Sequence, residues 1–179
     1  MSDAKPSRAT SANAEGLFEP FSQDAVPWDS YEKGRFGSRF KQLGRFGGGS
    51  HVGVVYEELA PGQQTCPLHY HMLEEEHVFV LAGSLTALIG DREYPMQAGD
   101  FVCFPAGQKA GHALINRGDQ PCRYLLIGED NPNDVCIYPK SGRIGVRLTG
   151  EGYRQSAVMD YWEGQDWEKS PAGPPRPVR

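Results

Sequence analysis

Short apolar runs recur along the chain about every ten residues, separated by turns that contain glycine or proline. Examples are HVFVLAG at 77–83, HALIN at 112–116 and CRYLLIG at 122–128. Two runs meet at Ala82–Ser84, and the second ends at a Gly90–Asp91 pair that is typical of a β-hairpin turn. Patterns with the period of an amphipathic helix are nearly absent. We therefore predict an all-β domain, folded as a closed antiparallel barrel or jelly roll.

The two ends of the chain lack this pattern. Residues 1–25 are rich in Ser, Ala, Asn and Lys and show no apolar period, so we predict a flexible N-terminal arm. Residues 170–179 end in PAGPPRPVR, and we predict a disordered tail because such a proline-rich sequence forms neither helix nor sheet. The residues between them, 26–169, are predicted to form a single domain.

The net charge and the cysteines indicate which binding partners and which cellular compartment to expect. A net charge of −5 gives no field that would attract polyanions, so we do not expect nucleic acid as a partner. The N-terminus has no apolar signal stretch, and no run approaches about 18 apolar residues, so we predict a cytoplasmic protein that binds no membrane. The cysteines show no C-x-x-C spacing and are expected to be reduced thiols: Cys66, Cys103, Cys122 and Cys136.

Histidines in two segments form a candidate metal site. His69 and His71 are two residues apart, so in a strand they project to the same side. Alternation along the next strand puts Glu76 on one face with Val78, where a carboxylate needs a partner. His112 opens a later strand and is the fourth candidate. Three imidazoles and one carboxylate favour Fe, Mn, Ni, Co or Zn over calcium and magnesium, which prefer oxygen ligands.

Other polar residues were considered for catalysis or ligand binding. Tyr56 and Glu58 share one face of a strand; if that face points inward they are candidates for acid–base or supporting roles, and otherwise they are solvent-exposed. Side chains expected to be structural or exposed are His51, His77, Glu74 and Glu75. Basic residues that could hold a phosphate-bearing substrate are Arg39, Arg45, Arg123 and Arg147.

Two spaced sets of residues support a family resemblance. The first set is Gly62, His69, His71, Glu76 and Gly83, and the second is Gly99, Pro105, Gly107, His112 and Asn116. They resemble the two motifs of the cupin superfamily, although the first motif has one extra residue before His69 and the second has two between Gly107 and His112. Roughly residues 26–164 resemble single-domain bacterial cupins of unassigned activity.

The resemblance implies a double-stranded β-helix barrel, commonly a homodimer, with one divalent transition metal per chain. Its ligands would be His69, His71, Glu76 and His112. Cupins include isomerases, dioxygenases, decarboxylases and lyases, so the fold does not fix the reaction. We expect a metal-dependent enzyme acting on a small polar metabolite such as a sugar or a carboxylate. The alternative is a non-catalytic module that binds or senses a metal or a small ligand.

Overall fold

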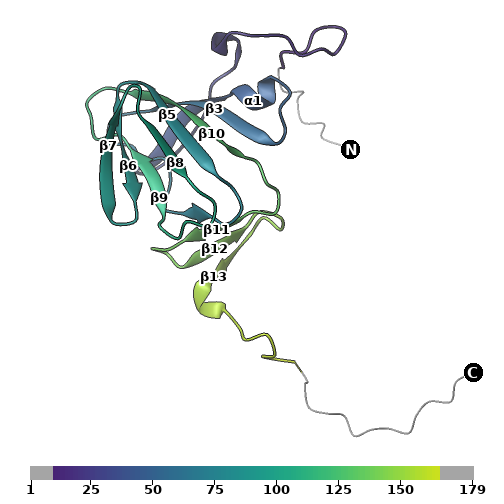
Figure 1. Cartoon of the computed structure of the whole chain (residues 1–179), viewed down its shortest axis with the longest axis vertical. Coiled ribbons are helices and arrows are strands. Elements are labelled where there is room, and N and C mark those ends of the chain that lie inside the picture. Colours follow the sequence, from purple (N-terminus) through teal and green to yellow (C-terminus); the bar gives the residue numbers. More distant parts are fainter. Residues whose placement is uncertain (1–9, 166–179) are drawn as a thin grey trace, which may run out of the picture.

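The computed structural model describes residues 10–165, and its regular structure is almost entirely β-strand (Figure 1). The strands are β1 (Asp29–Lys33), β2 (Phe36–Gln42), β3 (Val52–Leu59), β4 (Tyr70–His71), β5 (Glu76–Ala82), β6 (Ser84–Ile89), β7 (Arg92–Gln97), β8 (Phe101–Phe104), β9 (His112–Ile115), β10 (Cys122–Glu129), β11 (Val135–Tyr138), β12 (Arg143–Val146) and β13 (Glu151–Arg154). The helices are single turns: η1 (Gln23–Ala25), α1 (Leu43–Phe46) and η2 (Gln155–Ala157). No helix of the described residues is long and apolar enough to cross a membrane.

The strands form three antiparallel sheets. The largest has the order β1-β2-β3-β10-β5-β8, the second has the order β7-β6-β9, and the third has the order β13-β12-β11-β4. Figure 1 shows β11–β13 at one end of the barrel and α1 at the other. The predicted all-β class is therefore confirmed.

Strand β5 shows how alternation builds the core. Val78 and Val80 are fully buried, while the intervening Phe79 and Leu81 are about 40% exposed. The inner face of β5 packs on buried side chains of other strands, among them Leu59, Leu85, Leu114 and Tyr124. Glu76 lies two residues before Val78, so it faces the barrel interior, as the sequence pattern predicted.

The predicted turns around β6 are also confirmed. Gly83 joins β5 to β6 with a φ of +78°, and Gly90 joins β6 to β7 with a φ of +61°. Such left-handed conformations favour glycine. At Gly83 a side chain would also collide with the backbone, since a Cβ there would lie 2.8 Å from the carbonyl oxygen of Pro121.

Part of the predicted N-terminal arm contacts the barrel. The Ser11 amide donates to the Phe46 carbonyl oxygen at 2.9 Å, and the rings of Phe21 and Phe46 lie 4.8 Å apart. The flexibility of the arm stays a prediction. Residues 1–9 of the arm and the whole proline-rich tail, residues 170–179, lie outside the described residues.

Candidate metal centre

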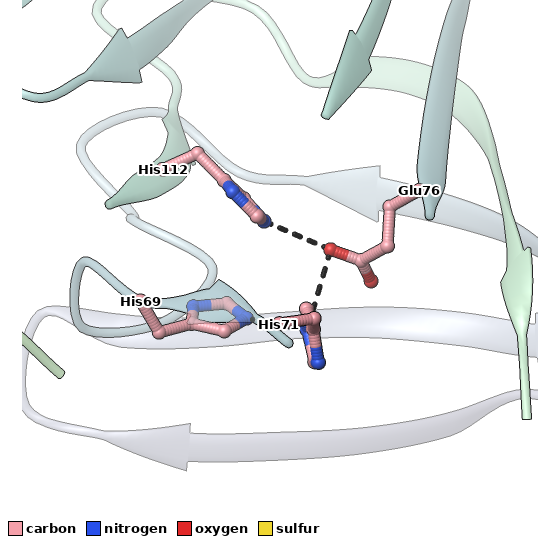
Figure 2. A group of neighbouring side chains, drawn as sticks. All are labelled: His69, His71, Glu76 and His112. Carbon is pink, nitrogen blue, oxygen red and sulfur yellow. Dashed lines mark hydrogen bonds and ion pairs between the residues drawn. The ribbon is translucent and has the colours of Figure 1, made fainter. Parts of the chain in front are cut away.

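The barrel interior brings together the four residues that the sequence predicted as metal ligands (Figure 2). One ligand atom from each of His69, His71, Glu76 and His112 lies within 4.8 Å of the others. His112 Nε2 is 2.9 Å from Glu76 Oε2, and His71 Nε2 is 3.6 Å from the same oxygen. The Nε2 atoms of His69 and His71 are 3.1 Å apart.

Backbone pairing holds the three histidines in place. His69 and His112 exchange two backbone hydrogen bonds, of 2.7 and 3.2 Å, and thereby join the start of β4 to β9. The Gly107 amide donates to the His71 carbonyl oxygen at 2.7 Å, and Gly107 adopts a φ of +72°. The two extra residues after Gly107 are accommodated in this turn, and His112 still reaches the cluster.

Hydrogen bonds to the outer ring nitrogens fix two of the imidazoles. His69 Nδ1 lies 3.0 Å from the Pro67 carbonyl oxygen, which can only accept, so Nδ1 carries the hydrogen. His71 Nδ1 lies 2.6 Å from a carboxylate oxygen of Asp134 and donates to it in the same way. Both Nε2 atoms then present lone pairs to each other at 3.1 Å. A proton on one of the two rings, or a metal ion bound by both, makes this contact attractive.

The spacing of the donor atoms fits a transition metal. Metal–ligand bonds of about 2.0–2.1 Å separate neighbouring ligand atoms by about 3.0 Å in octahedral geometry and about 3.4 Å in tetrahedral geometry. Three of the separations in the cluster are 2.9, 3.1 and 3.6 Å, and all of them are within 4.8 Å. A mixed set of imidazoles and a carboxylate also suits these metals.

Two of the four residues are in the protonation state that metal binding requires. Burial, together with the neighbouring His112, lowers the pKa of His69 to about 4. Burial alone would raise the pKa of Glu76, but the hydrogen bond from His112 and the adjacent imidazoles outweigh it and bring that pKa to about 2. At neutral pH His69 is therefore neutral and Glu76 ionised, as ligands must be.

A buried acidic network behind His71 was missed by the sequence analysis. Asp134 is fully buried and accepts hydrogen bonds from both His71 and the Leu73 amide. Glu74 is only 2% exposed, so the prediction of a solvated position was wrong. Its carboxylate lies 2.6 Å from Arg147 Nη1, contributed by the residue after β12, and 3.3 Å from His71 Nδ1. Glu75, by contrast, is exposed as predicted.

The two remaining histidines lie away from the cluster. His51 is exposed. His77 lies on the outer face of β5, 3.0 Å from Glu75, and stacks on Phe101. The expectation that both are structural or exposed agrees with these positions.

A cavity of about 240 Å³ adjoins the candidate ligands. Its walls are formed by Tyr31, Phe40, Gln42, Val55, Glu57, Thr65, Cys66, His69, Glu76, Val78, Phe104, His112, Ala113, Leu114, Tyr124 and Leu126. Within residues 10–165, no lysine or arginine lines it. A second hollow of about 270 Å³, between Thr10 and Phe46, contains none of the candidate ligands.

The side chains of Tyr56 and Glu58 do not face this cavity. Alternation along β3 directs Val55 and Glu57 inward, so the residues between them point to the other face of the sheet. Tyr56 packs there on Trp28, and Glu58 pairs with arginines of the neighbouring strands. The glutamate of β3 that lines the cavity is Glu57, which the sequence analysis did not select.

All four arginines considered for substrate binding are engaged in ion pairs. Arg39 and Arg123 both bind Glu58, at 2.7 and 2.8 Å. Arg45 binds Asp130 at 2.9 Å, and Arg147 bridges Asp130 and the buried Glu74. None of these guanidinium groups reaches the cavity wall.

Comparisons with known proteins agree with this fold. The cupin domain family matches residues 55–128. A candidate sugar phosphate isomerase from Acidithiobacillus ferrooxidans is 32% identical, with a TM-score of 0.66, over 69% of this chain and 80% of that one. A sugar phosphate isomerase of the cupin superfamily from Silicibacter pomeroyi is 28% identical, with a TM-score of 0.70, over 81% of this chain and 98% of that one.

A more distant relative shares the fold alone. A predicted oxalate decarboxylase from Thermotoga maritima is 18% identical, with a TM-score of 0.54, over 62% of this chain and 98% of that one. No curated protein matches the chain. The antiparallel barrel, the matched domain and the relative that is 32% identical lead to one conclusion. The chain belongs to the cupin superfamily.

Proposed function

We propose that His69, His71, Glu76 and His112 bind one divalent transition metal: Fe, Mn, Ni, Co or Zn. The observation that carries the proposal is the convergence of three imidazoles and one carboxylate, with one ligand atom from each lying within 4.8 Å of the others. A metal in this position supplies a Lewis acid that polarises a carbonyl or hydroxyl oxygen of a substrate.

The protein is proposed to be an enzyme that isomerises a small sugar or a related α-hydroxy carbonyl compound. Two relatives with the same fold are named as sugar phosphate isomerases. The cavity, at about 240 Å³, is smaller than the roughly 300–1,000 Å³ of pockets for drug-sized ligands, so it suits a small metabolite. Among the described residues no lysine or arginine lines it, so a phosphate on the substrate would have no basic side chain to bind there.

Several side chains would support the reaction without taking part in it. Asp134 holds the His71 ring so that Nε2 faces His69 and Glu76. Cys66 lies 3.4 Å from His69, but burial raises the pKa of its thiol to about 12. In the metal-free protein the thiol therefore stays protonated near neutral pH and is a poor nucleophile. The homodimer and the cytoplasmic location remain predictions.

A substrate screen tests the proposed function. Chelator-treated protein is compared with protein reloaded with each candidate metal, on short aldoses and ketoses with and without a terminal phosphate. Aldose–ketose conversion, followed by proton NMR, is expected only in a metal-loaded sample and should be lost in His112→Ala. Metal binding without conversion of any sugar would contradict the enzyme proposal and favour the alternative, a non-catalytic ligand-binding module.

A further inference from the structure

Two adjacent glutamates on β3 have opposite environments. Glu58 lies directly across from Arg39 on β2 and Arg123 on β10, and it binds both. Glu57 lies across from Phe40 and Tyr124 in the same two strands. Cross-strand neighbours share one face of a sheet. The two arginines therefore neutralise Glu58 on the outer face, whereas the neighbours of Glu57 on the inner face carry no positive charge.

Burying Glu57 in this way is costly to the fold. Its side chain is 6% exposed, and no ion pair compensates its charge within the described residues. Unpaired carboxylates are disfavoured in protein interiors, where an apolar residue or a glutamine would be tolerated better. A structural role therefore does not account for this glutamate, and perturbed carboxyl groups in cavities are typical of functional sites.

The groups around Glu57 form a polar wall facing the candidate metal centre. Tyr124 and Ser38 lie beside the carboxyl group, yet their hydroxyl groups have no hydrogen-bond partner in the described residues. Tyr31 donates to the Thr65 carbonyl oxygen instead. Glu57 and Glu76 line the same cavity, but Glu57 is outside the cluster of candidate ligands.

The charge states suit proton transfer at this wall. Burial raises the pKa of Glu57 to about 7, because it outweighs the nearby hydroxyl groups of Ser38 and Tyr124, which lower this pKa; Glu76 adds a smaller increase. Burial also raises the pKa of Tyr31 to about 12 and that of Tyr124 well above its ordinary value. The phenols therefore remain hydrogen-bond donors near neutral pH, while Glu57 exchanges a proton easily, which is the property of an efficient general base and acid.

We propose that Glu57 is the acid–base residue of this cavity, and this proposal rests on the isomerase function proposed above. Its carboxylate removes the proton from the hydroxyl-bearing carbon that is adjacent to the substrate carbonyl. The C–H electron pair forms a carbon–carbon double bond, and the carbonyl oxygen takes the negative charge. The hydroxyl proton then passes to that oxygen, and Glu57 returns its proton to the neighbouring carbon. No oxidant or other reactant is consumed.

Solvent deuterium incorporation tests this role. Metal-loaded protein in D₂O is incubated with the same aldose and ketose panel, and deuterium at the substrate carbon is measured by NMR and mass spectrometry. Glu57→Gln is expected to slow incorporation about 100- to 10,000-fold, the usual contribution of general acid–base catalysis, while its metal content stays equal to that of wild type. Glu57→Asp keeps a carboxyl group and should retain part of the rate.

The exposed Glu32 of β1 provides the matched control, and Glu32→Gln should incorporate deuterium at the wild-type rate. Wild-type incorporation by a folded Glu57→Gln would overturn the role of Glu57 and leave the isomerase function standing. If that variant does not fold, incorporation by Glu57→Asp no faster than without protein would contradict the proposal. Metal-loaded wild type that converts no sugar would overturn the isomerase function itself, whereas conversion without deuterium incorporation would overturn proton transfer by Glu57.

Discussion

Glu57→Gln should change how the stability of the metal-free protein depends on pH. In the folded chain burial raises the pKa of Glu57 from its ordinary value of 4.5 to about 7. A change of this size corresponds to about 3 kcal/mol of folding free energy. Since the group is almost fully buried, solvent screening reduces this figure little.

The sign follows from proton binding in the two states. Below pH 4.5 Glu57 is protonated in both the folded and the unfolded state, so it does not change the free energy of unfolding. Between pH 4.5 and about 7 the unfolded chain ionises first, so the folded state loses stability as the pH rises. Above about 7 both states are ionised and the full penalty remains. The substitution removes this penalty, so Glu57→Gln should gain stability relative to wild type as the pH increases.

Chemical unfolding of chelator-treated protein, followed by tryptophan fluorescence, measures the effect. The lowered pKa of His69 gives wild type an opposing slope over part of this range, because burial keeps that ring neutral. The quantity to plot is therefore the difference in unfolding free energy between Glu57→Gln and wild type. It should rise by about 3 kcal/mol from pH 4.5 to 7.5. A difference that is constant with pH would refute the reasoning, and Glu32→Gln controls for the loss of a charge.

Two further substitutions test the support around the candidate metal centre. Asp134→Asn should weaken metal affinity about 10- to 100-fold, because it removes the charge that orients an imidazole; chelator competition measures this, with the exposed Asp160→Asn as control. Arg147→Met should lower the free energy of unfolding by about 2–3 kcal/mol in urea, because it leaves Glu74 buried without its partner. Arg117→Met breaks only an exposed ion pair and should cost at most about 1 kcal/mol. Equal costs for the two arginine variants would contradict the buried-pair assignment.

Much of the barrel could be predicted because its signals are local. The apolar runs and the glycines at their ends match β5, β6 and β7, and the alternation along β5 gave the correct direction of Glu76. Strand β4 has only two residues, too few to form a periodic pattern. Its position depends on pairing with β11, about 65 residues later in the chain, which no local pattern reveals.

The positions at the site that the sequence left open or predicted wrongly have the same origin. In the VVYEEL segment, alternation allows either Glu57 or Glu58 to face inward, because each glutamate shares its face of the strand with apolar residues. The ambiguity is resolved by the strand register, which pairs Glu58 with arginines on both neighbours. The burial of Glu74 likewise depends on Arg147, a residue distant in sequence. Interactions between distant segments, rather than local propensity, decided these positions.

Metal content is the most direct test of the central proposal. Protein purified without an affinity tag, together with His71→Ala and His77→Ala, is analysed for Fe, Mn, Ni, Co and Zn after reconstitution. We predict about one metal ion per chain in wild type, at least about tenfold less in His71→Ala, and no change in His77→Ala, whose side chain lies outside the barrel. Wild type that retains no metal, or His71→Ala that retains a full equivalent, would contradict the proposed metal centre.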